Sequence, residues 1–230
     1  FKHTMKVNNS LEKTIDAYGD DHVGSSATTP LRADAFELSN PKKVELIQEK
    51  VAAILEILGM DLTDDSIKGT PNRVAKMYVN EIFGGLHPDK KPKASTFSNK
   101  YKYGEILVEK NITLYSTCEH HLLPIVGKAH VAYISTGTVV GLSKMNRIVQ
   151  YYAQRPQVQE RLTIQIVEEL KQVLGTEDVA CVIDAKHLCV NSRGIRDISS
   201  STITSEFGGA FKNKETKREF LDYIQLDTEF

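Results

Sequence analysis

The chain has 230 residues and a mass of 25.7 kDa, with 40% hydrophobic and 26% charged residues, proportions that exclude wholesale disorder and suffice for a buried core. Its 29 Lys and Arg residues nearly balance its 30 Asp and Glu residues, which argues against a general nucleic-acid binder or a polybasic membrane binder. Three cysteines, no signal-peptide pattern and no run approaching about 20 apolar residues predict a cytoplasmic protein with reduced thiols.

Residues 1–40 are predicted to form a mobile N-terminal arm ahead of a folded domain at residues 41–230. The arm is polar and mixed, with little periodic apolar signal apart from a short helix expected around residues 11–18. Phe1–Thr4 precede Met5, and this position favours a vector origin for these four residues.

Two amphipathic helices are predicted at the start of the folded domain. Asn40 is the expected cap of the first helix and Thr70 that of the second, and a proline follows each cap. Gly59 and Gly84 are expected to end them. Each helix has one apolar stripe, made by Val44, Ile47, Val51, Ile54, Leu55 and Leu58 in the first and by Val74, Met77, Tyr78, Ile82 and Phe83 in the second.

The remainder of the chain is predicted to alternate between pairs of strands and pairs of helices. In order, we expect a strand or hairpin over 106–114, a strand over 126–134, helices over 143–152 and 157–174, strands over 179–184 and 199–205, and a closing helix over 216–224. Strands that follow strands indicate antiparallel pairing and an α+β fold with a four-stranded sheet. The edges of such a sheet need cover, so oligomerisation is a reasonable expectation.

Thiols and imidazoles gather in two short clusters, each just after a predicted strand. Cys118 and His121 are three residues apart, with His120 between them, so one turn can present a thiolate and an imidazole to one metal. His187 and Cys189 are two apart, a spacing that places both on one side of an extended segment. Cys118, His121 and Cys189 would give zinc three ligands and one open position, leaving His120 and His187 as acid–base groups. A structural zinc site with a fourth ligand and ordinary buried cysteines both stay open from spacing alone.

Two further candidates are assigned to packing. Cys181 lies inside the apolar run 179–183, where a small buried hydrophobe is expected. His130 lies within a strand pattern and is expected to serve packing or the surface instead of binding a metal.

Cations gather at the start of the helix predicted after the second strand. Ser143 can cap this helix, and Lys144 and Arg147 lie three apart on one face near its N-terminus. Free backbone N–H groups and two cations make a phosphate site, although a solvated basic helix end fits the same residues. Arg73 and Arg193 can add positive charge, and together these residues indicate a polyphosphate-like ligand next to the metal.

Gln159 and Glu160 lie at the start of the next predicted helix. A carboxylate there commonly compensates the helix dipole. It can also accept two hydrogen bonds from an N–H and an adjacent NH2 group, which is the edge that guanine presents. Both interpretations stay open from these residues alone.

Four stretches of the sequence resemble the GTP cyclohydrolase I family. They read DDSIKGTPNRVAKMYVNEIFGGL, STCEHHLLPIVGKAHVAYI, GLSKMNRIVQYYAQRPQVQERLT and DAKHLCVNSRGIRD. The resemblance covers residues 42–226 and implies a tunnelling fold: a four-stranded antiparallel sheet with two inserted helices, preceded by N-terminal helices. It also implies that sheets join across subunits into a barrel, in a homodecamer of two pentamers with active sites at subunit interfaces.

The same resemblance implies a zinc-dependent hydrolase that converts GTP and water to 7,8-dihydroneopterin triphosphate and formate, the first step of tetrahydrofolate and pterin biosynthesis. It assigns zinc binding to Cys118, His121 and Cys189, protonation of guanine N7 to His120, further acid–base roles to His187 and Ser143, guanine binding to Glu160 and Gln159, and the triphosphate and ribose to Lys144, Arg147, Arg193 and Arg73. Glu119 is expected near a neighbouring subunit's site.

Two other functions are compatible with parts of this pattern. A relative with the same fold can bind a purine or pterin and reduce a nitrile with a free cysteine as nucleophile, without three zinc ligands. A non-catalytic scaffold would hold zinc in a closed four-ligand site. Metal content and turnover separate these alternatives from the hydrolase.

Overall fold

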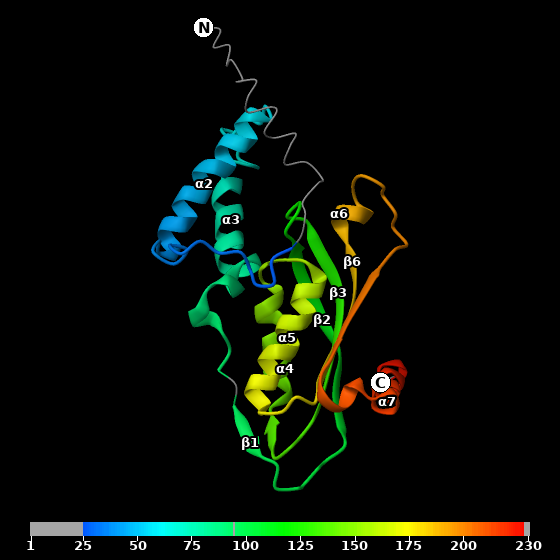
Figure 1. Ribbon diagram of the computed structural model, residues 1–230. Helices are drawn as coiled ribbons and strands as arrows, with labels where there is room; N and C mark the ends of the chain where they lie inside the picture. The colour runs from blue at the N-terminus through cyan, green and yellow to red at the C-terminus, as the bar shows by residue number, and fades with distance from the viewer. Residues whose placement is uncertain (1–24, 94, 228–230) are drawn as a thin grey trace. The chain divides into compact units, whose positions relative to one another are not determined.

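The computed structural model describes residues 25–93 and 95–227 of the chain (Figure 1). The chain divides into two compact units, Phe1–Pro30 and Leu31–Phe230. The described part of the first unit has no helix or strand. The short helix expected around residues 11–18 and the residues Phe1–Thr4 lie outside the described residues, and the domain boundary after residue 40 stays a prediction.

Two helices begin the second unit, as predicted, but their caps differ from the expected ones. Helix α2 spans Asn40–Ile57, and Ser39 caps it because its side chain accepts a hydrogen bond from the backbone of Lys42. Asn40 is therefore inside the helix. Helix α3 spans Thr70–Met77 and has Gly69 as its cap, without a side-chain hydrogen bond. In both cases the helix starts one residue before the proline, so the prediction placed each cap one residue too late.

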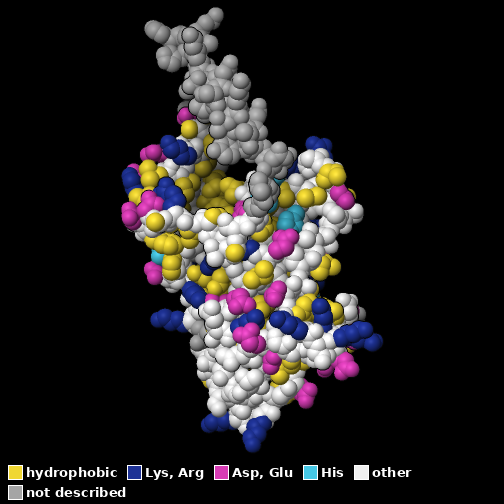
Figure 2. Space-filling view, in the orientation of Figure 1, with side chains coloured by type: hydrophobic (Ala, Val, Ile, Leu, Met, Phe, Trp, Pro, Cys, Tyr) yellow, Lys and Arg dark blue, Asp and Glu magenta, His cyan; other side chains and the backbone are white. Residues whose placement is uncertain are grey.

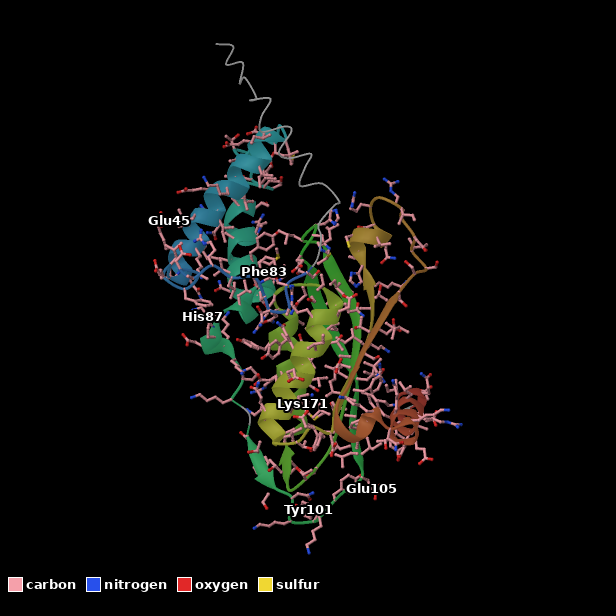
Figure 3. All side chains as sticks on the ribbon, viewed as in Figure 1. Glu45, Phe83, His87, Tyr101, Glu105 and Lys171 are labelled. Atoms are coloured by element: carbon pink, nitrogen blue, oxygen red, sulfur yellow. The ribbon has the colours of Figure 1, made fainter. Side chains whose placement is uncertain are left out.

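Short helical turns continue from α3. They are η1 (Tyr78–Ile82, a π-helix), η2 (Gly84–Leu86) and η3 (Pro88–Lys90). Figure 3 labels Phe83 and His87 on this segment. The carbonyl of Gly85 accepts a hydrogen bond of 2.8 Å from Arg155 Nε, which ties the segment to the residues that follow helix α4 (Leu142–Ala153).

The main sheet has five strands in the order β5-β2-β3-β6-β7. Their bounds are Pro156–Gln157 for β5, Ile106–Cys118 for β2, Pro124–Ile134 for β3, Val179–His187 for β6 and Thr202–Phe207 for β7. The last four are antiparallel, so the predicted four-stranded antiparallel sheet and the α+β class are confirmed. The additional strand β5 is parallel to the end of β2, which makes the sheet mixed. The sequence reading also missed a small sheet of β1 (Thr96–Ser98) and β4 (Thr138–Val140).

Strand β2 is one continuous strand, not a hairpin, and it contains a bulge. Glu109 pairs with Val131 and Ile112 pairs with Ala129, so two residues of β2 face His130. Asn111, one of the two, has a left-handed φ of 58°, a conformation that asparagine adopts more readily than most residues. Its backbone N–H donates to Nδ1 of His130 at 3.3 Å. His130 is buried, so its predicted packing role is confirmed.

Helices cover both faces of the sheet (Figure 1). Helices α4 (Leu142–Ala153) and α5 (Gln159–Leu174) pack on one face around the larger core cluster, which includes Cys181. Helix α7 (Lys214–Gln225) packs on the other face, where Phe211 and Phe220 meet Ala180 and Val182. Successive residues of β6 thus point to opposite cores, as strand geometry requires. Cys181 is fully buried, as predicted.

The ends of the two inserted helices test the predicted signals. Gly175 ends α5 in the left-handed conformation with φ 66°, so the predicted end of this helix at residue 174 is confirmed. Lys171 lies in the last turn of α5 (Figure 3), where a cation is favourable. The cap of α4 is Gly141, not Ser143 as expected. Among the described helices, none is long and apolar enough to cross a membrane.

Candidate active site

Two thiols and one imidazole converge at one end of the sheet. They belong to Cys118 at the end of β2, His187 at the end of β6 and Cys189 in the short helix α6 (Leu188–Asn191). Their possible ligand atoms all lie within 4.8 Å of one another. Two thiols and an imidazole are donors that zinc prefers, so these residues fit a zinc ion.

The register of strand β3 explains why these residues meet. Strands β2 and β6 both pair with β3, from opposite sides. Pro124 of β3 lies opposite Thr117, and the next residue, Ile125, lies opposite His187. Both neighbouring strands therefore end at the same level of β3. The predicted extended spacing of the second cluster is wrong, because helix α6 begins directly after His187.

A buried glutamine fixes the orientation of His187. Gln159, 1% exposed, donates through Nε2 to Ile183 O (3.1 Å), Thr202 O (2.8 Å) and Thr204 Oγ1 (3.1 Å). Two carbonyl acceptors identify that atom as the amide nitrogen. Its Oε1 therefore faces Nε2 of His187, at 2.8 Å. An amide oxygen only accepts, so Nε2 of His187 carries a proton.

The two thiols differ in their tendency to ionise. Burial works against ionisation of Cys118, but hydrogen bonds with His187 and the backbone of His120 bring its pKa down to about 6. Burial and the neighbouring Cys118 raise the pKa of Cys189 to about 11. At neutral pH the pair thus holds one thiolate beside one thiol. The Sγ atom of Cys118 also lies 3.7 Å from Nδ1 of His120, so one predicted acid–base residue borders the group.

His121 lies outside the group of three, although the sequence predicted it as a metal ligand. Its Nε2 is 2.9 Å from Nη1 of Arg193. A guanidinium only donates, so His121 uses its acceptor nitrogen there. The backbone N–H of Leu122 donates to Cys118 O at 2.9 Å. His121 and Cys118 therefore share one turn, as the spacing predicted, but the two side chains point to different partners.

The predicted phosphate-binding residues on helix α4 lie away from the thiols in a single chain. Oγ of Ser116 donates to the carbonyl of Ala153 at 2.7 Å, so it is the C-terminal end of α4 that lies beside the end of β2. Ser143 is ten residues earlier, about 15 Å along the helix axis, and Arg147 lines a separate open hollow with Lys90.

Arg73, another predicted phosphate-binding residue, makes a hydrogen bond within its own helix. It lies on α3, where its guanidinium donates to Thr70 Oγ1 at 2.9 Å.

The two residues predicted for guanine binding differ in exposure. Glu160 is exposed in the first turn of α5, so its carboxylate is accessible to a ligand. Gln159, by contrast, uses both ends of its amide inside the protein. The structure thus gives Gln159 a further contact, with His187, that spacing did not indicate.

An ion pair that was not predicted from the sequence joins the turn after strand β2 to helix α5. Glu119 pairs with Arg161, whose side chain is 3% exposed. A cation in the first turn of a helix opposes the helix dipole, and this was the signal in the sequence that could have drawn attention to Arg161. The predicted position of Glu119 near a neighbouring subunit remains untested, and in the chain itself its carboxylate is bound by Arg161.

Comparison with known proteins gives a consistent result. The family model described as GTP cyclohydrolase I matches residues 47–225. A protein of Flavobacterium johnsoniae named GTP cyclohydrolase 1 is 73% identical over 224 residues, covering 97% of this chain and all of the relative. Proteins of the same name from Klebsiella pneumoniae and Salmonella arizonae are 50% and 51% identical over 217 residues, covering 94% of this chain and 98% of each relative.

Proposed function

Because the chain belongs to the GTP cyclohydrolase I family, we propose that it is a zinc-dependent hydrolase converting GTP and water to 7,8-dihydroneopterin triphosphate and formate. The reaction would be the first step of tetrahydrofolate and pterin biosynthesis, in the cytoplasm. The observation that carries the proposal is the convergence of Cys118, His187 and Cys189. His187 contacts Gln159, the residue before Glu160, whose carboxylate is suited to guanine.

Cys118 and Cys189 are the proposed thiolate ligands of zinc. Zinc held by three protein ligands lowers the pKa of a water molecule toward neutrality and so supplies a nucleophile for hydrolysis. The lowered pKa of Cys118 supports this role, since a metal binds the thiolate form. Cys118 ends strand β2, and Cys189 lies two residues after the end of β6, so both thiols are attached to the sheet, a rigid support of the kind that a precise site needs.

The proposal keeps His121 as the imidazole ligand and His187 as an acid–base group. The side-chain geometry offers His187 in the ligand position instead, so experiment must separate the two. Alanine variants of each histidine provide the test: the variant of the true ligand loses zinc, and the other variant retains zinc while losing activity. Loss of zinc in both would indicate a closed four-ligand site and favour the scaffold function.

The other polar residues have roles in positioning and proton transfer. His120 is proposed to donate a proton to N7 of guanine, which makes C8 electrophilic, and Ser143 and His187 to assist the later opening of the ribose. Glu160 would accept two hydrogen bonds from the guanine edge, with Gln159 behind it. The remaining proposed substrate ligands carry positive charge toward the triphosphate and ribose: Lys144, Arg147, Arg193 and Arg73. The triphosphate is not consumed, so its binding serves to position the base.

A second subunit is proposed to complete the site. The N-terminal end of α4, which bears Lys144, is separated from the thiols of the same chain by about the length of that helix. This separation supports a site assembled between chains. Hydrophobic side chains reach the surface over α2 and α3 (Figure 2), and Ile54, Ile57 and Leu58 are exposed. Within the described residues, strand β7 pairs on one side only. These features support the tunnelling-fold barrel and a homodecamer of two pentamers.

The test is GTP turnover by the purified protein, followed by formate release and pterin fluorescence, with and without a chelator. Formation of both products, loss on chelation and recovery with zinc are expected. Bound zinc without turnover would instead support the scaffold, and turnover that survives chelation would contradict the role of zinc.

A further inference from the structure

Arg161 is a buried cation at a position where a helix disfavours one. It is the third residue of α5, and its side chain is 3% exposed. The N-terminal end of a helix carries partial positive charge, so a cation there is unfavourable unless other groups compensate it. Burial adds a desolvation cost that only close partners offset. The stability of α5 by itself therefore does not explain Arg161.

The guanidinium of Arg161 reaches two separate segments. Its Nε donates to Gln157 Oε1 at 3.0 Å, and its Nη2 donates to the carbonyl of Pro156 at 3.1 Å and to Oε2 of Glu119. A planar guanidinium can make these contacts together because its donors have a fixed fork geometry, which a lysine lacks. One side chain thus joins strand β5, the start of α5 and the turn after β2.

The turn after β2 is the segment that carries the metal-binding cluster. Glu119 lies between Cys118 and His120, and its backbone N–H donates to the carbonyl of Gln157 at 3.0 Å. The backbone thus fixes one end of the turn, and the ion pair with Arg161 fixes a side chain inside it. Two residues before Arg161, Gln159 orients His187. The ion pair therefore links the two halves of the site.

We propose that Arg161 is a positioning residue: through Glu119 it holds the turn that bears Cys118 and His120 against the first turn of α5, which bears Gln159 and Glu160. This inference rests on the proposed function and deepens it. One proposed zinc ligand, Cys118, and the proposed proton donor, His120, belong to the turn, and the guanine base would be held from α5, so their alignment depends on this contact. Arg161 itself need not touch the substrate.

The variant Arg161→Met tests the proposal in the full-length protein. It removes the charge, keeps much of the side-chain volume and leaves Glu119 without its guanidinium partner. Zinc affinity, measured by competition with a chelator, and kcat are each expected to fall about 10- to 100-fold, the range typical of residues that orient metal ligands. The KM for GTP should change less than kcat. Adding Glu119→Gln should restore part of the loss, because the unpaired carboxylate is removed; strictly additive losses would contradict the coupling.

Lys91→Met is the matched control. Lys91 Nζ lies 2.6 Å from Oε2 of Glu169, whose side chain is 7% exposed, so this variant likewise leaves a carboxylate, here a buried one, without its cation. It should lower Tm without changing zinc affinity or kcat. If Arg161→Met behaves in the same way, Arg161 is merely structural and the proposal is wrong.

Two further outcomes are covered by the design. Should Arg161→Met fail to fold, Arg161→Lys keeps the charge but loses the fork, and it should show the same losses in smaller measure. The proposal would be overturned if Arg161→Lys and Glu119→Gln each had the same zinc affinity and kcat as the unmodified protein. If the unmodified protein does not turn over GTP, the proposed function fails, whereas the comparison of zinc affinities still decides the role of Arg161.

Discussion

Replacing Gln159 with leucine tests whether one buried amide supports both the sheet and the histidine beside the thiols. The amide nitrogen has two hydrogens, which it shares among Ile183 O, Thr202 O and Thr204 Oγ1. The amide oxygen accepts from His187. The substitution therefore removes two donated hydrogen bonds and one accepted bond, at a residue that is 1% exposed.

The expected fall in the free energy of unfolding follows from the number of hydrogen bonds removed. A hydrogen bond contributes about 1 kcal/mol net to the free energy of unfolding, so three lost bonds predict a fall of about 3 kcal/mol. For a chain of this length, 230 residues, each kcal/mol corresponds to roughly 2–4 °C, which gives a fall in Tm of roughly 6–12 °C. The leucine side chain adds apolar contact and places the result toward the lower end of this range.

Thermal unfolding followed by circular dichroism measures the change in Tm, and nitrogen NMR of the zinc-free protein measures the His187 tautomer. The spectrum should show the Nε2–H tautomer in the unmodified protein and a mixture in Gln159→Leu. Gln150→Leu is the control, because Gln150 donates a single hydrogen bond, of 2.6 Å, to the carbonyl of Thr113. A Tm for Gln159→Leu equal to that of this control, with an unchanged tautomer, would refute the reasoning.

Four further outcomes are expected. Cys118→Ser and Cys189→Ser should each lose zinc and GTP turnover together, as measured by metal analysis and formate release; turnover without zinc would contradict their role. His120→Ala should keep zinc but release little formate, and normal formate release would remove its role as the acid. Lys144→Ala should weaken binding of GTP more than binding of guanosine by calorimetry, whereas equal weakening would argue against a phosphate contact. Burial keeps the pKa of His130 below its ordinary value of 6.5, so this histidine binds a proton more readily in the unfolded chain than in the folded chain. The free energy of unfolding should therefore fall as the pH drops below about 6.5. His130→Asn should reduce this dependence in urea titrations at pH 7 and pH 5, and an unchanged dependence would contradict the assignment.

Periodicity and turn residues predicted the long elements of the fold. The helix predicted over residues 157–174 located α5, and the strand predicted over residues 126–134 located β3. These signals succeed because each such element buries one face along its whole length. Strands of two or three residues, such as β5 and β1, have no measurable period and become strands only through their partners.

The candidate site was predictable as a set of residues but not as a geometry. Spacing and chemistry selected Cys118 and Cys189, whose thiols the structure brings together. Spacing placed His187 on the same side as Cys189, but it did not show that His187 would join the two thiols while His121 turns to Arg193. Side-chain orientation depends on partners far away in the sequence. The same limit explains why the contact between Glu119 and Arg161 was missed.

The two thiols follow different neighbours of β3, because Cys118 ends β2 and Cys189 comes just after β6. Metal binding by both thiols therefore depends on how these strands are aligned. Successive side chains of a strand point to opposite faces, so a slip of one residue between β2 and β3 would turn Cys118 away from Cys189. The bulge opposite His130 lies in the same strand pair, and losing its extra residue would cause such a slip. A metal ion that binds only the aligned sheet stabilises that form alone. Zinc binding would thus favour the one strand alignment in which both thiols reach the metal, and it would disfavour a sheet in which β2 is shifted by one residue.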